Sequence, residues 1–351
     1  MMRKNQQMQN NLHLAVIIIV VTILTTGCAG VTISHSSQSE IKNQKRPKLT
    51  FAENEEFIVL ITKPNDSLKS LAKKYLGDKD KAWIIADFNN IRKIVPKREI
   101  VIPLKSQNKI GVTVEGIQAI PILCYHRFGS GHTKLAVSEK KFKQQMKYLD
   151  DNNYNVIPMK DVYDFLENKK PLPRKSVVIT IDDGYRSTYD TAFPVLKSYN
   201  FPATLFLYTD FTGARDAISW KQAKLMNQSG LMDIQPHSKT HPNMSLRKSD
   251  ESQIAYQARI LQEITVPGKE ITKRLNNNMH TFAYPYGDTN PMIIGLLKKD
   301  NYNLGVTVQP GSNTAFSPPF MLQRTMIFGD HSIDDFSKAL VTFKKKIKKK
   351  K

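Results

Sequence analysis

The chain has 351 residues, of which 40% are hydrophobic and 24% are charged, with 16 glycines and 18 prolines. This composition excludes a collagen, a coiled coil, a multispan membrane protein and a wholly disordered chain, and the length suits two domains with tails. The formal net charge is +21, and seven of the positive charges are lysines within residues 344–351. So basic a chain is expected to be attracted to an anionic partner. Two cysteines, Cys28 and Cys124, are too few for a disulfide framework.

The N-terminal segment has the features of an export signal. Arg3 and Lys4 precede an apolar run over residues 14–24, which as a helix is too short to cross a bilayer. Small residues and then Cys28 follow, and this order resembles a bacterial lipoprotein signal. The resemblance implies cleavage before Cys28 and a membrane anchor through lipid on its thiol; the alternative is an uncleaved anchor helix running through Ile33. Both interpretations predict export, with the chain lipid-anchored or helix-anchored to the cell envelope.

Residues 57–104 predict a small domain of βααβ order, because two strand-like runs, FIVLI and EIVIPL, bracket two helical patterns. The module resembles a LysM domain in residues 65–68, 75–78, Trp83, Asn89, Pro96 and 102–103. That resemblance implies binding to glycans that contain N-acetylglucosamine. The alternative is a degenerate spacer.

Strand-like and helical segments alternate through the larger domain, residues 118–343. The candidate strands are 119–125, 177–181, 204–208, 231–235, 281–284 and 304–308. The candidate helices are 139–152, 159–167, 189–199, 221–228, 249–264 and 291–299. Such alternation favours an α/β barrel or a doubly wound sheet.

Polar residues follow four of these strands directly. His126 follows the strand 119–125, and Asp182 and Asp183 follow the strand 177–181. His237 and His241 follow the strand 231–235, and the turn 285–287 follows the strand 281–284. The carboxyl ends of the strands form the rim where α/β barrels build active sites. The sequence therefore predicts one converging site.

The spacing of two histidines indicates a metal centre. In His-Ser-Lys-Thr-His the imidazoles of His237 and His241 are four residues apart, within reach of one ion. One carboxylate would complete a two-histidine, one-carboxylate set with open positions, which suits zinc and would also suit iron or cobalt. Of the adjacent Asp182 and Asp183, one can bind the metal while the other acts as a base. The alternative is a pair of histidines with no joint role.

Residues 180–184, 237–242 and 285–287 together resemble the polysaccharide deacetylases with a NodB-homology domain, carbohydrate esterase family four. The resemblance implies a distorted (β/α) barrel and metal-dependent removal of N-acetyl groups from a glycan. It also implies that Asp183, His237 and His241 hold a divalent metal, with zinc expected first. Asp182 would be the general base, and the backbone N–H of Tyr286 would stabilise the oxyanion.

Two positions depart from the family pattern. Ala283 stands where the family carries an arginine that pairs with the catalytic aspartate; Arg324 is the candidate replacement, and a surface arginine is the alternative. The late histidine motif that supplies the general acid is absent, and His331 is expected on the surface. His126 is the better candidate for the acid, in an arrangement that resembles the branch acting on poly-β-1,6-N-acetylglucosamine. The alternative for His126 is a buried structural histidine.

The resulting hypothesis is an exported N-deacetylase acting on peptidoglycan or poly-N-acetylglucosamine. The alternatives are an inactive glycan-binding lipoprotein and an O-acetyl esterase. Neither nucleic acid nor a protein partner is expected. The lysine tail is expected to be solvated or attracted to an anionic surface. Cys124 is expected to be a buried small hydrophobic residue. The predicted parts are a signal at 1–27, a polar tether at 28–50, a LysM-like domain at 51–105, a linker at 106–117, a deacetylase domain at 118–343 and a polybasic tail at 344–351.

Overall fold

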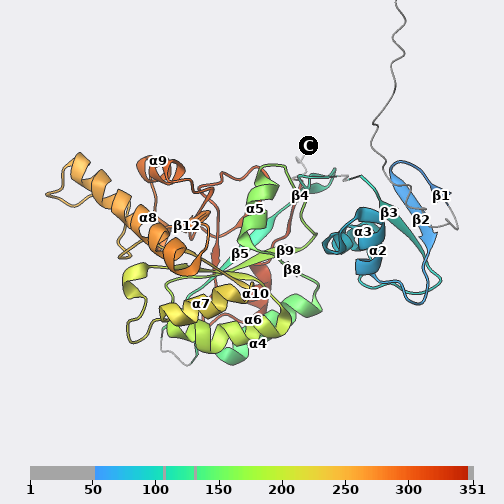
Figure 1. Ribbon diagram of the computed structural model, residues 1–351, viewed down its shortest axis with the longest axis horizontal. Helices are drawn as coiled ribbons and strands as arrows, with labels where there is room; N and C mark the ends of the chain where they lie inside the picture. Colours follow the sequence, from blue (N-terminus) through green and yellow to red (C-terminus); the bar gives the residue numbers. More distant parts are fainter. Residues whose placement is uncertain (1–51, 106–107, 130–132, 347–351) are drawn as a thin grey trace, which may run out of the picture. The chain divides into compact units, whose positions relative to one another are not determined.

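The computed structural model describes residues 52–105, 108–129 and 133–346 (Figure 1). The predicted signal, the tether and Cys28 lie outside these residues. Within the described ranges, no helix has both the length and the apolar character that crossing a bilayer would need.

The small N-terminal module has the predicted βααβ order. Its antiparallel sheet runs in the order β1-β2-β3, with bounds Ala52–Glu53, Phe57–Ile61 and Glu99–Pro103. Between β2 and β3 lie α2 (Leu68–Leu76), the 3-10 turn η1 (Lys79–Lys81) and α3 (Ala82–Asn89). The core of the module is apolar, formed by Ile58, Leu60, Leu71, Ala72, Ile85, Ile100 and Ile102. The two strand-like runs and the helical spacing between them therefore predicted the order of these elements.

A parallel sheet forms the centre of the larger domain. Its strands in spatial order are β11 (Met232–Pro236), β10 (Ala203–Leu207), β9 (Ser176–Ile181) and β5 (Ile120–Tyr125). Three short strands extend it: β8 (Asn155–Val156), β14 (Ser312–Asn313) and β15 (Thr325–Met326). The strands β6 (Arg127–Phe128) and β7 (Ala136–Val137) form a separate parallel pair. Because β5, β9, β10 and β11 are parallel, their carboxyl ends meet at one edge.

The sheet is apolar on both faces, as expected of parallel strands covered on two sides. Successive residues point to opposite faces, so Leu123 and Tyr125 enter one core while Ile122 enters the other. The first core includes side chains of α4 (Glu139–Asp151), α6 (Phe193–Tyr199) and α7 (Trp220–Gln228), which lie together with α10 (Ile333–Lys338) on one side of the sheet (Figure 1). The second includes side chains of α5 (Met159–Leu166).

A separate parallel pair, β12 (Thr281–Ala283) and β13 (Leu304–Val306), faces the second core. Within the described residues no backbone ladder joins β11 to β12, so closure of the predicted barrel stays a prediction. The side chain of Gln235 bridges the two strands instead. Its Oε1 accepts the backbone N–H groups of His280 at 2.9 Å and Thr281 at 3.1 Å, and its Nε2 donates to Asn278 O at 3.0 Å. This bridge sets β12 beside the end of β11.

The helix predicted for residues 249–264 is wrong at both ends. The structure places α8 at Gln253–Leu275, continuing through Pro267. The buried positions keep a helical spacing past the proline, at Tyr256, Ile260, Ile264, Pro267, Ile271 and Leu275. Packing of this face therefore outweighs the local preference of proline against a helix interior.

The helix predicted for 189–199 begins as a π-helical turn, Thr188–Ala192, before α6. The helix α9 spans Pro291–Lys299, as predicted, and packs against α8. The strand β16 (Phe343–Lys345) pairs with β4 (Gly116–Gln118). This ladder includes residues 116 and 117 of the predicted linker and 344 and 345 of the predicted tail.

Candidate active site

The two adjacent aspartates follow β9 at the sheet edge where the parallel strands end. The Asp182 N–H donates to Tyr125 O at 2.8 Å, which continues the pairing with β5 by one residue. Asp183 then has a φ of 73°, and Gly184 a φ of 86°. That φ is strained for any residue with a Cβ, and a Cβ on Gly184 would also press on the side chain of Leu207, so the turn favours glycine. The turn allows both carboxylates to approach one site.

Asp183, His237 and His241 lie together as the sequence predicted. The Nε2 atoms of the two histidines are 3.2 Å apart, and Asp183 Oδ1 is 3.7 Å from His237 Nε2 and 3.4 Å from His241 Nε2. Ligands at about 2.0–2.1 Å from a tetrahedral zinc are about 3.4 Å apart. The three atoms therefore fit a shared divalent ion, and they form one of two His/Cys/Asp/Glu groups of metal-binding geometry in the described part of the chain.

The hydrogen bonding of His237 leaves the correct nitrogen free for a metal. Its Nδ1 lies 2.8 Å from Ala283 O on β12, so Nδ1 carries the proton and Nε2 keeps its lone pair. Burial lowers the pKa of His237 to about 3 and also lowers the pKa of His241. Both imidazoles are therefore neutral at pH 7, as metal ligation requires.

Burial also raises the pKa of Asp183, to about 6. A carboxylate desolvated in this way gains most from a neighbouring cation, because opposite charge favours its ionised form. This environment agrees with a metal ligand.

Arg324 is buried, with an exposed fraction of 0%, so the surface-arginine alternative is wrong. Its Nη1 and Nη2 donate to the two oxygens of Asp182 at 2.6 and 2.7 Å, a bidentate pair. Further bonds run from Nε to Thr307 O at 2.8 Å and from Nη1 to Thr180 Oγ1 at 3.1 Å. The arginine precedes β15, which pairs with β5 beside Cys124. The ladder therefore brings the guanidinium to Asp182.

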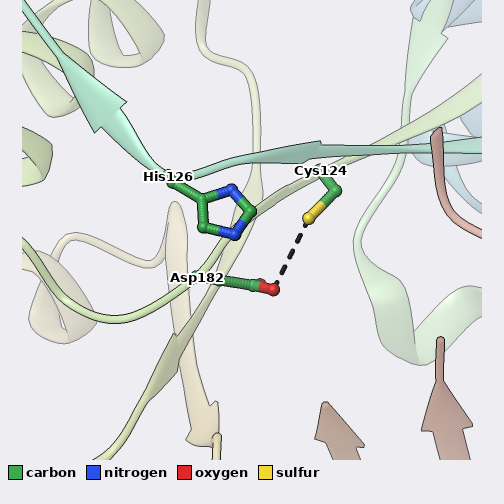
Figure 2. A group of neighbouring side chains, drawn as sticks. All are labelled: Cys124, His126 and Asp182. Atoms are coloured by element: carbon green, nitrogen blue, oxygen red, sulfur yellow. Dashed lines mark hydrogen bonds between the residues drawn. The ribbon is translucent and has the colours of Figure 1, made fainter. Parts of the chain in front are cut away.

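Burial alone would raise the pKa of Asp182, but the charge and hydrogen bonds of Arg324 hold it below its usual range. A third donor is the thiol of Cys124, whose Sγ lies 3.5 Å from Asp182 Oδ2 (Figure 2). Burial raises the pKa of this thiol well above its usual value, so it stays protonated. Cys124 is buried as predicted, but its contact with a carboxylate was missed, because nothing in the run IPILCY distinguishes it from a core residue.

His126 leaves the end of β5 and its ring lies beside Asp182 and Cys124 (Figure 2). The ligand atoms of these three residues lie within 4.8 Å of one another. The buried Nδ1 of His126 is one of the side-chain atoms in the described residues without a hydrogen-bond partner. His331, by contrast, is partly buried rather than exposed, and its Nδ1 accepts the N–H of Phe328 at 3.3 Å. His126 therefore keeps an unpartnered ring nitrogen next to Asp182.

Tyr286 lies in a tight turn next to the metal cluster. Its φ and ψ are 60° and 2°, after Pro285, as at the third position of a type II turn. The Gly287 N–H closes this turn on Tyr284 O at 2.8 Å. Tyr286 is 60% exposed, and its ring contacts the His241 ring at a centroid distance of 5.0 Å. The structure thus brings all seven predicted site residues to one end of the sheet.

The family model for polysaccharide deacetylases matches residues 169–305 of the chain. A protein of Bacillus subtilis (strain 168) named as the polysaccharide deacetylase YxkH is 30% identical over 208 residues, 59% of this chain and 71% of that protein. The chain belongs to the polysaccharide deacetylase family.

Other relatives are similar in sequence or in structure. The poly-β-1,6-N-acetyl-D-glucosamine N-deacetylase of Staphylococcus aureus (strain MRSA252) is 30% identical over 202 residues, 56% of this chain and 69% of that protein. The Streptococcus pyogenes deacetylase PplD, solved with acetate, has a TM-score of 0.58 at 29% identity, covering 63% of this chain and 98% of its own. IcaB from Ammonifex degensii has a TM-score of 0.56 at 25% identity, covering 64% of this chain and 96% of its own.

Added Zn²⁺ is expected to raise the melting temperature of metal-free protein by several degrees. An ion that binds only the native state at a free concentration a thousand times its dissociation constant stabilises that state by about 4 kcal/mol. Differential scanning fluorimetry with and without Zn²⁺ measures the shift. The Asp183→Ala variant should lose most of it, and an undiminished shift in that variant would place the ion elsewhere.

Proposed function

We propose that the protein is a metal-dependent N-deacetylase that removes acetyl groups from N-acetylglucosamine residues of a polysaccharide. The observation that carries this proposal is the meeting of Asp183, His237 and His241 beside a carboxylate, Asp182, that Arg324 holds ionised. The second possibility is an inactive glycan-binding protein, and the observation in its favour is Ala283, which stands where the family carries an arginine. Arg324 supplies the corresponding pairing from another part of the chain, which favours an active enzyme.

In this proposal Asp182 is the general base. When bound, the divalent ion would activate water and polarise the amide carbonyl. Asp182 accepts the proton of the water as it attacks the carbonyl carbon. Arg324 and Cys124 together donate three hydrogen bonds to the Asp182 carboxylate, which fixes the direction in which its remaining lone pairs point. A base held in this way loses little orientational freedom in the reaction.

His126 and Tyr286 complete the proposed hydrolysis. The backbone N–H of Tyr286 donates to the oxygen that becomes negative when water adds to the carbonyl. His126 donates a proton to the sugar nitrogen as the carbon–nitrogen bond breaks, which releases acetate and a free amine. An imidazole is suited to this step, because its usual pKa of about 6.5 lies near neutral pH.

The leading substrates are poly-β-1,6-N-acetylglucosamine and the glycan of peptidoglycan. The named activity of the Staphylococcus relative supports the first, and the LysM-like residues of the small module support the second. The test is acetate release from each polymer by the purified chain, with mass spectrometry of the oligomers. Release from neither would contradict the proposal, and release only from an O-acetylated glycan would favour an esterase instead.

Replacing His126 with glutamine is expected to lower kcat for acetate release about 100-fold or more while KM changes little, because proton donation acts in the transition state. An acetyl ester with a good leaving group needs no protonation and should be hydrolysed at nearly the normal rate. His331→Gln is the matched control, because among the described residues the hydrogen bond of the His331 ring stays within its own loop, to the N–H of Phe328. Equal losses on both substrates would show that His126 is not the acid.

We further propose that the chain is exported and anchored to the cell envelope through a lipid on Cys28, and that the small module binds glycans containing N-acetylglucosamine. The order of residues 1–28 supports the anchor, and the βααβ order with its LysM-like residues supports the binding role. Metabolic labelling with a fatty-acid analogue tests the anchor, since Cys28→Ser should abolish labelling. Sedimentation of the Asp182→Asn chain with insoluble peptidoglycan tests the module.

A further inference from the structure

A buried carboxylate on α8 contacts the loop that carries both histidines of the metal cluster. Glu263 is only 6% exposed and lies on the buried face of the helix, between Ile260 and Pro267. Ionised carboxylates are rarely buried without a partner. In the described residues no cation lies within ion-pair distance of Glu263, so its partners must be hydrogen-bond donors.

All three donors come from the segment between His237 and His241. Glu263 Oε2 accepts the backbone N–H groups of Lys239 and Thr240, each at 2.9 Å, and Oε1 accepts the Thr240 hydroxyl at 2.8 Å. Two successive backbone N–H groups that point at one oxygen form an anion-binding concavity. The loop thus supplies the hydrogen bonds that the buried carboxylate needs, and the same bonds hold the conformation of the loop.

The loop needs such support, because its backbone is strained at two positions. Ser238 has a φ of 69° and His241 a φ of 60°, values that cost free energy for residues other than glycine. Ser238 Oγ accepts the His241 N–H at 2.9 Å from within the loop. Glu263 is the contact that ties the loop to a long, packed helix.

From these contacts we infer that Glu263 is a positioning residue for the metal centre: it holds the loop so that His241 and His237 already face Asp183 before an ion binds. This inference rests on the proposed metal site. Glu263 touches neither the proposed ion nor the substrate, so its effect is on affinity for the ion and on the geometry of the ligands. Loss of such outer partners typically weakens metal binding about 10- to 100-fold.

The test is the Zn²⁺ dissociation constant of the full chain, measured by competition with a chromogenic chelator, together with the visible spectrum of the Co²⁺-loaded protein. Glu263→Ala should bind Zn²⁺ about 10- to 100-fold more weakly and alter the Co²⁺ spectrum. Glu263→Gln keeps an acceptor but loses the charge, and should bind several-fold more weakly, since charge-assisted bonds are the stronger ones. Glu270→Ala, which removes an exposed pair with Arg274 on the same helix, should leave affinity and spectrum unchanged.

Zn²⁺ affinity equal to wild type in the folded glutamate variants would overturn the inference while leaving the metal site intact. If Glu263→Ala does not fold, Glu263→Gln decides by the same criterion. Absence of Zn²⁺ binding by the wild-type chain would instead overturn the proposed function, and this inference with it. The two failures are therefore distinguishable.

Discussion

Asp182→Asn is expected to lower kcat for acetate release about 1,000-fold, within the range of general-base catalysis, while the protein still binds one Zn²⁺. The asparagine keeps an oxygen for Arg324 but cannot take a proton from water. Initial rates of acetate release, measured with metal content on the same preparation, check both parts of the expectation.

Asp183→Asn is the matched control, because it removes the neighbouring carboxylate from the metal set instead. That variant should lose Zn²⁺ affinity together with activity. If Asp182→Asn released acetate at the wild-type rate, Asp182 would not be the base. If it lost metal as readily as Asp183→Asn, the division of roles between the two aspartates would be wrong.

Arg324→Met is expected to reduce the free energy of unfolding by about 3–5 kcal/mol, because it leaves Asp182 buried and without its charged partner. Activity should fall as well, since Asp182 would lose two of the three side-chain donors that orient it. Urea unfolding of the metal-free protein measures the first effect, and acetate release from folded protein measures the second.

Lys147→Met provides the contrast on stability. It breaks an exposed ion pair with Asp151, at 2.8 Å, and exposed pairs of this kind contribute little to stability. The free energy of unfolding of Arg324→Lys should lie between those of wild type and Arg324→Met, because a lysine keeps the charge but not the bidentate geometry. A loss below about 1 kcal/mol for Arg324→Met would contradict the account of this buried pair.

The metal cluster could be predicted from the sequence because its members follow strands. Parallel strands end at one edge, so residues placed directly after them must lie near one another. The two histidines are also only four residues apart, which local geometry alone brings together. The same reasoning placed His126 and Tyr286, since each follows a strand of the same domain.

From the sequence, Arg324 could be proposed as the partner of Asp182 but could not be distinguished from a surface arginine. It is 142 residues from Asp182, and no local pattern around MLQRTMI states whether its side chain is buried. The pairing of β15 with β5 places Arg324 next to Asp182. Strand pairing between residues so far apart in the sequence depends on the fold of the whole chain.

Glu263 was missed for a different reason. It lies inside the predicted helix, residues 249–264, but its burial depends on a packed face that continues through Pro267 to Leu275, beyond the end of that prediction. An acidic residue at a core position of a helical repeat is the signal that would have pointed to it. Its partners, two backbone N–H groups, depend on the strained turn between the histidines and carry no signature in side-chain type.

The most direct test of the central claim is anomalous diffraction at the zinc absorption edge from crystals of the Zn²⁺-loaded protein. We predict one peak at about 2.0–2.1 Å from Asp183 Oδ1, His237 Nε2 and His241 Nε2, with Asp182 still paired with Arg324. A peak among Cys124, His126 and Asp182, the second group with metal-binding geometry, or no peak at either group, would contradict the account.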